Sequence, residues 1–162
     1  MSWKITIQRA KPNPAGKDKA GYSPKPEQLL GEWVDLKNTG DTEVHHSTLH
    51  LTHTEFNSSC AVTKQHVVYW NGSGSAVLKP GQTVRVHTGK QSQAASMKAE
   101  DQNGPDMHAY AEKGNFILNN DCGDKLGLRW TSSGTWYSDD EASYNPKPKE
   151  GEVLIRIGDK LV

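Results

Sequence analysis

The chain has 162 residues, of which 33% are hydrophobic, and its 19 Lys and Arg residues balance 19 Asp and Glu residues. This length fits one domain, residues 1–162, that can bury a core without a metal or a disulfide as a staple. The balanced charge excludes the whole-molecule positive field on which non-specific nucleic-acid binders depend, and no apolar run is long enough to span a membrane as a helix.

Apolar and polar residues alternate along much of the chain, and this period of two predicts β-strands rather than helices. The first strand alternates through Trp3, Ile5 and Ile7. Prolines and glycines then exclude residues 10–31 from strand pairing, so this segment is expected to be a long surface loop. The residues expected to form the core are Ile5, Ile7, Val34, Leu36, Leu49, Leu51, Val84, Val86, Leu126 and Leu128.

The second half of the chain continues the pattern. Residues 79–82 (KPGQ) have proline and glycine where a type II turn requires them. Residues 90–105 are polar and are expected to form an exposed loop that could hold a short helical turn. Residues 131–134 form a hairpin tip, and residues 146–162 form a C-terminal extension that ends in an alternating strand through Val153, Ile155 and Ile157. About nine short strands without an internal repeat are typical of an all-β sandwich.

The two cysteines, Cys60 and Cys122, are expected to be reduced thiols. The opening residues MSWKITIQ contain no apolar signal region, so a cytoplasmic location is expected. Two cysteines without a secretory context rarely form a disulfide framework.

Several separated motifs carry a family resemblance. Residues 31–40 (GEWVDLKNTG), 78–89 (LKPGQTVRVHTG) and 119–128 (NNDCGDKLGL) occur in that order and resemble the lamin tail domain family, as it is found in bacterial proteins. The resemblance covers roughly residues 3–145. It implies an immunoglobulin-like β-sandwich that acts as an interaction module, since lamin tail domains bind proteins and DNA. Two departures are His46 to Leu49, where the family has a glycine-tryptophan step, and Cys122 in the asparagine-rich corner.

Two clusters contain residue types that bind metals. His46 and His50 would share one strand face, whereas His53 would point to the other and His45 lies just before them, so a zinc site would need further ligands. Asp139, Asp140 and Glu141 could supply oxygen ligands for calcium, but their spacing lacks the pattern of a calcium loop and favours a solvated strand edge. No cofactor is predicted, and whether either cluster binds a metal stays open.

No catalytic constellation is recognisable in the sequence. There is no G-x-S-x-G motif, and the two cysteines lie in polar, turn-like surroundings. A non-enzymatic binding function is therefore expected.

The candidate binding residues fall into two groups. Trp130, Trp136 and Tyr137 flank the hairpin tip and could form a stacking surface for a sugar or a base, or a cross-strand pair that stabilises the hairpin. The second group is the basic leader with Lys11, Lys17, Lys19 and Lys25, which could bind nucleic acid weakly. Protein–protein interaction is the main functional expectation, and carbohydrate binding or weak nucleic-acid binding are the alternatives.

Overall fold

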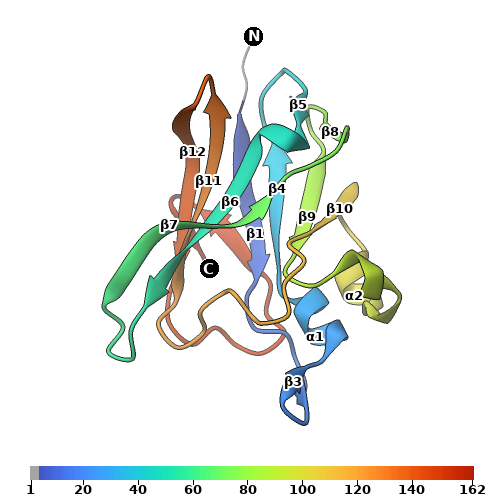
Figure 1. Ribbon diagram of the computed structural model, residues 1–162, viewed down its shortest axis with the longest axis vertical. Helices are drawn as coiled ribbons and strands as arrows, with labels where there is room; N and C mark the ends of the chain where they lie inside the picture. Colours follow the sequence, from blue (N-terminus) through green and yellow to red (C-terminus); the bar gives the residue numbers. More distant parts are fainter. Residues whose placement is uncertain (1–3) are drawn as a thin grey trace.

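The computed structural model describes residues 4–162, with Ser132 described by its backbone alone, so Trp3 lies outside the described residues. The chain is built mostly from strands, which confirms the all-β prediction (Figure 1). The strands are β1 (Ile5–Lys11), β2 (Lys19–Ala20), β3 (Ser23–Pro24), β4 (Trp33–Asn38), β5 (Val44–His45), β6 (Leu49–Phe56), β7 (Val62–Asn71), β8 (Val77–Leu78), β9 (Thr83–His87), β10 (Met107–Tyr110), β11 (Asp124–Ser132), β12 (Thr135–Tyr144), β13 (Leu154–Ile157) and β14 (Lys160–Leu161). The helices are α1 (Pro26–Gly31), η1 (His46–Thr48), η2 (Gln91–Ser96) and α2 (Ala99–Gln102), where η marks a 3₁₀-helix.

Ten of the strands form one continuous sheet in the order β10-β9-β4-β1-β13-β14-β12-β11-β6-β7. The pairs β9–β10 and β12–β14 are parallel and the others are antiparallel. Figure 1 shows β6 and β7 crossing in front of β1 and β4, and residues of β1, β4, β6, β7, β9, β11 and β12 belong to one hydrophobic core. The sheet therefore curls over so that its two halves bury the same core.

The predicted core residues are confirmed. All ten are completely inaccessible to solvent, because in each strand they lie on the face that points toward the other half of the sheet. Large side chains that the alternation did not single out complete the core, notably Tyr69 and Trp70 of β7 and Leu154 of β13.

The segment 10–31, expected to be a surface loop, ends in a helix instead. Pro26 stands in the first turn of α1, where its fixed φ favours a helix and its missing N–H is not needed. Leu29 and Leu30 are buried, and the Leu29 carbonyl accepts a hydrogen bond from the Gly89 N–H at 3.1 Å. The expected exclusion from strand pairing is also wrong, because residues 10–11 end β1 and the strands β2 and β3 pair with each other.

The segment 90–105 is also more ordered than an exposed loop. It contains η2 and α2, and Asp101 of α2 is buried. This segment covers the face of β4 and β9 that points away from the core, where polar side chains need partners. The polar composition therefore reflected buried ion pairs as well as solvent exposure.

The C-terminal extension holds two strands rather than one. In β13 the buried residue is Leu154, whereas Ile155 and Ile157 are 55% and 66% exposed. The apolar alternation from Val153 to Ile157 predicted the strand but not the face that it buries, because the strand is paired with β1 through Arg9 and Ala10.

Candidate interaction surface

The β11–β12 hairpin projects beyond its neighbours in the sheet (Figure 1). The ladder between β6 and β11 ends at the pair Leu49 and Trp130, whereas β11 and β12 stay paired as far as Ser132 and Thr135. Ser133 and Gly134 both have positive φ, 50° and 80°, as a tight two-residue hairpin turn requires. The tip is thus a tight turn that extends past the end of the β6–β11 ladder.

The three aromatic residues predicted at the tip lie on both faces of the hairpin. Trp130 and Tyr137 are paired directly across the strands and stack with ring centroids 4.4 Å apart, which confirms the cross-strand pair. Trp136 is opposite Thr131 and therefore points to the other face. A single stacking surface made of all three rings is excluded by this alternation.

Trp136 is the centre of a small surface group that we call the tip cluster, made of His50, Arg129 and Trp136. The Arg129 guanidinium lies over the Trp136 ring, 4.7 Å from its centroid, and the His50 ring meets the same indole edge-on at 4.7 Å. His50 is held in turn by a hydrogen bond between its Nδ1 and the Asn71 Oδ1. Trp136 is still 43% exposed, so this apolar ring is held in position and faces solvent.

The basic leader does not form one basic surface. Lys11 is buried and its Nζ lies 2.7 Å from Asp101 Oδ1, so it is not part of an exposed basic surface. Lys17 and Lys19 are exposed and Lys25 is partly buried. Lys11 is separated from the other lysines because it is the last residue of β1 and lies beneath α2. The other three lysines follow after the end of this strand.

The histidines between residues 45 and 53 do not converge. The 3₁₀ turn η1 interrupts the strand after His45, so His46 turns inward against Trp70 while His50 faces the hairpin. His53 is buried beside Asp124, at 3.5 Å, and Tyr69. Among residues 4–162 there is no group of three or more His, Cys, Asp or Glu side chains arranged to hold a metal ion.

The acidic cluster of β12 is not a solvated edge. Asp139 Oδ2 accepts the Ile5 N–H and Asp140 Oδ2 accepts the Ile7 N–H, both at 2.7 Å. The Arg156 guanidinium donates two hydrogen bonds to the Asp140 carboxylate, of 2.7 and 2.9 Å. These carboxylates accept backbone N–H groups of β1 in the part of the strand that is not paired with β13. The interpretation as a solvated edge is therefore wrong.

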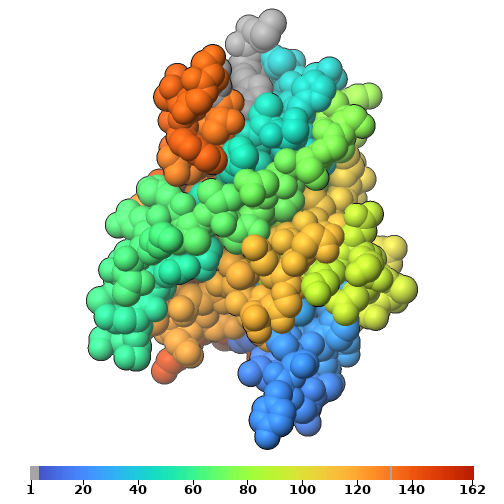
Figure 2. All heavy atoms as spheres, in the orientation of Figure 1, coloured from blue at the N-terminus to red at the C-terminus, as the bar shows by residue number. Residues whose placement is uncertain are grey.

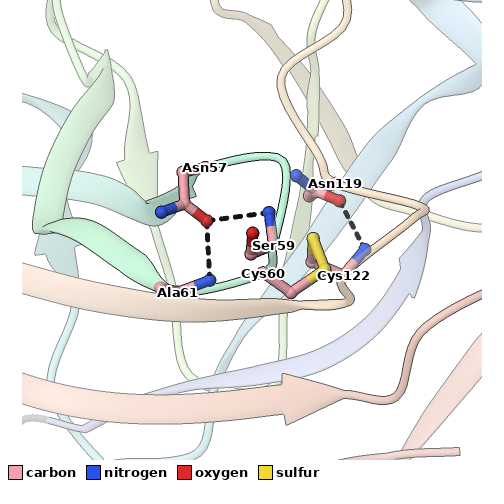
Figure 3. Close-up of a disulfide and its surroundings, with 6 residues drawn as sticks. All are labelled: Asn57, Ser59, Cys60, Ala61, Asn119 and Cys122. Carbon is pink, nitrogen blue, oxygen red and sulfur yellow. Dashed lines mark hydrogen bonds between the residues drawn. A yellow bond between two sulfur atoms is a disulfide. The ribbon is translucent and has the colours of Figure 1, made fainter.

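The two cysteines form a disulfide, contrary to the expectation of reduced thiols. The turn at Cys60, after β6, meets the corner at Cys122 although 62 residues separate them in the chain. Figure 3 shows how asparagines shape both turns: Asn57 Oδ1 accepts the Ser59 and Ala61 N–H groups, and Asn119 Oδ1 accepts the Cys122 N–H. Local sequence could not reveal the pairing, because the turns meet only where β11 pairs with β6, a strand far from it in the chain.

The asparagine corner is structural, as predicted from its composition. Gly123 has φ +73°, and a Cβ atom there would lie 2.3 Å from the Tyr144 carbonyl oxygen. The Tyr144 hydroxyl donates a hydrogen bond to the Asn119 carbonyl.

Glu32 is a buried acid that the sequence interpretation missed. Its Oε1 accepts hydrogen bonds from the Thr88 hydroxyl and from the Ile117 and Leu118 N–H groups, whereas its Oε2 is buried without a partner. Burial raises the pKa of this carboxyl to about 7, against the lowering effect of those hydrogen bonds. The sequence contained one signal that could have revealed this residue, which is a charged side chain directly before the buried strand β4.

A second missed feature is an ionic network beneath α2. The Arg85 guanidinium binds both oxygens of Asp35, at 2.7 and 2.9 Å, and lies 3.5 Å from the centre of the Trp33 ring. The Trp33 Nε1 donates to Asp101 Oδ1, which also holds Lys11. These groups alternate with the core residues of β1, β4 and β9, so they stabilise the outer face of the same strands.

Comparison with known proteins adds no identity. No model of a known protein family matches the chain, and no curated protein is significantly similar to it. In the described part of the chain, no helix is long and apolar enough to cross a membrane.

Proposed function

We propose that this protein is a non-enzymatic interaction module that binds a partner protein through the tip cluster. The observation that carries the proposal is Trp136, a large aromatic ring that is 43% exposed yet held by Arg129 and His50. Trp, Tyr and Arg are the residues that dominate binding energy in protein interfaces. Pre-ordering of such side chains reduces the entropy lost on binding.

The fold proposed for this module is an immunoglobulin-like β-sandwich of the lamin tail domain type. The motifs at residues 31–40, 78–89 and 119–128 support it, as do the curled sheet and the single core between its halves. Fold alone does not define a partner, so the functional proposal rests on the tip cluster.

Carbohydrate binding is the second candidate, because Trp136 and Tyr137 are 43% and 44% exposed. A sugar stacks on a bare aromatic face, whereas Arg129 covers one face of Trp136 and Trp130 stacks on Tyr137. This arrangement favours a protein partner over a sugar.

The disulfide contradicts the reduced cysteines that were expected together with a cytoplasmic location. Disulfides persist mainly in oxidising compartments. An oxidising compartment is therefore the proposed setting of the folded domain.

The test is a quantitative pull-down from native extract with three immobilised baits: wild type, Trp136→Ala and Tyr22→Ala. Tyr22 is fully exposed and lies in the leader between β2 and β3, so it is a matched aromatic control. A partner protein should be retained by the wild-type and Tyr22→Ala baits and reduced at least tenfold on Trp136→Ala.

Two outcomes would contradict the proposal. Equal retention of all captured proteins by the three baits would remove the tip cluster as the binding surface. A glycan array on which wild type binds a sugar and Trp136→Ala does not, with no protein partner, would replace the protein by a carbohydrate.

A further inference from the structure

A groove follows the edge strand β10 on the side of the molecule formed by β10 and by the loop after β7. Its volume is about 530 Å³, within the range of known ligand sites. Residues 106–110 form one wall, and His46, Trp70 and residues of the loop 72–76 form the other. We call it the β10 groove; in Figure 2 the light-green segment after β7 lies beside the gold segment of β10.

The groove exposes an unpaired strand edge. Within the described residues β10 is the last strand of the ten-stranded sheet and is paired only with β9. The Ala111 N–H, at the end of β10, donates to the His87 carbonyl at 2.7 Å. Since backbone groups alternate along a strand, those of His108 and Tyr110 point away from β9, toward the groove. Such an edge is a template for another strand.

The opposite wall contains a buried polar atom without a partner. His46 is 4% exposed, and its Nε2 makes no hydrogen bond. Its backbone is fixed by the bond from its N–H to the Ala76 carbonyl at 2.9 Å, and a Cβ at Gly72 would lie 1.7 Å from its carbonyl oxygen. An unsatisfied buried group carries a free-energy cost that a ligand amide can relieve. Burial also lowers the pKa of His46, so its ring is neutral and can donate or accept at neutral pH.

The charge of the groove is acidic. Asp106 and Glu112 are exposed carboxylates at its lining, and no Lys or Arg side chain belongs to that lining. One oxygen of Asp106 accepts a hydrogen bond from the Thr83 N–H at 2.8 Å. One oxygen of Glu112 accepts a hydrogen bond from the Gln91 N–H at 3.3 Å. Five residues lie between the two carboxylates in the chain, a span of at most about 20 Å, so they match two charges on an extended segment.

We propose that the β10 groove binds an extended, basic segment of a partner protein, which adds to β10 as a further strand. Its basic side chains meet Asp106 and Glu112, and one of its backbone amides meets His46 Nε2. This site is separate from the tip cluster, and the proposal does not depend on the function assigned to that cluster.

The probe is a fluorescein-labelled, end-capped heptapeptide, Lys-Thr-Val-Thr-Val-Thr-Lys, titrated with the full chain by fluorescence anisotropy. It should bind at least tenfold more tightly than the matched peptide with glutamate at both ends. The double variant Asp106→Asn/Glu112→Gln, which keeps the hydrogen-bonding oxygens, should weaken its binding about tenfold. Trp136→Ala should leave the Kd of the peptide unchanged. A failed proposal for the β10 groove can therefore be distinguished from a failed proposal for the tip cluster.

Hydrogen exchange followed by NMR tests strand addition directly. With the lysine peptide bound, the amides of His108 and Tyr110 should exchange at least tenfold more slowly, whereas the Ala109 amide, which already faces β9, should change little. Equal binding of the glutamate peptide, absence of binding by either peptide, or unchanged exchange at His108 and Tyr110 would overturn the proposal. Binding of lysine amide as tight as that of the heptapeptide would identify a small-amine pocket instead.

Discussion

At the scale of single residues, Glu32 shows how burial favours the neutral form of an acid. Its folded pKa of about 7 lies above the usual value of 4.5, so the folded state binds a proton that the unfolded state releases. Stability from this group is therefore present below pH 4.5 and is lost as pH rises to 7. The size of the loss is about 3 kcal/mol at most.

The prediction is that Glu32→Gln removes this dependence. Urea unfolding at pH 5, 6, 7 and 8 should show the variant gaining stability relative to wild type as pH rises, with the difference level above pH 7. The comparison with wild type is needed because His87 acts in the opposite direction: burial lowers its pKa to about 4, so it destabilises the fold as pH falls from 6.5 to 4. A constant difference between the two proteins across this range would contradict the assignment to Glu32.

At the scale of elements, α2 is anchored to the sheet by the Asp101 side chain and by Arg85, which donates to the Asp101 and Asn103 carbonyls. Asp101 accepts from the Trp33 Nε1 and from the Lys11 Nζ, and both donors are buried. Its neighbour Glu100 also pairs with Lys11, at 3.4 Å, but is 61% exposed. Both adjacent acids pair with Lys11, but only Asp101 is buried and also accepts the Trp33 Nε1.

Asp101→Ala should cost about 3–5 kcal/mol of unfolding free energy, because it leaves the buried Lys11 ammonium without its close partner. Glu100→Ala should cost less than about 1 kcal/mol, as exposed ion pairs do. Urea denaturation of both variants measures the difference, and similar costs would show that α2 is not anchored through Asp101.

At the scale of the whole molecule, the disulfide between Cys60 and Cys122 joins the turn after β6 to the corner before β11. It closes a loop of 62 residues, and such a crosslink stabilises mainly by restricting the unfolded chain. Reductant is therefore expected to destabilise the protein, whereas a chelator is expected to leave its stability unchanged.

Reduction should lower the free energy of unfolding by about 2–4 kcal/mol and Tm by about 5–15 °C. Differential scanning calorimetry with and without reductant measures this. The variant Cys60→Ser/Cys122→Ser should melt at the reduced temperature under both conditions. A wild-type Tm that is the same with and without reductant would mean that the disulfide does not stabilise the folded state.

Nucleic-acid binding is also a property of the whole charge distribution. Arg9 and Lys11 of the leader are engaged by Asp35 and Asp101, which leaves fewer cations available to release counterions. Labelled duplex DNA, followed by anisotropy, should bind weakly at low salt and not at physiological salt, with Lys17→Glu/Lys19→Glu weaker still. Tight binding at physiological salt would favour a DNA-binding domain.

The sequence alone determined the fold class and most of the core. Its period of two marks the strands, and residues such as Leu36 and Leu128 are apolar because one face of every strand is buried. Turn chemistry was equally local: Gly81 has φ +84° and the Gln82 N–H donates to the Lys79 carbonyl, as the motif predicted.

Only the tertiary structure decided which distant residues meet. The disulfide, the hold of Asp139 and Asp140 on β1, and the burial of Lys11 beneath α2 all join segments far apart in the chain. Local propensity carries no information on such pairs, because a cysteine, an aspartate or a lysine in a polar stretch looks the same whether it faces water or a partner. The β10 groove is likewise absent from the sequence, since its walls come from the two ends of a curled sheet.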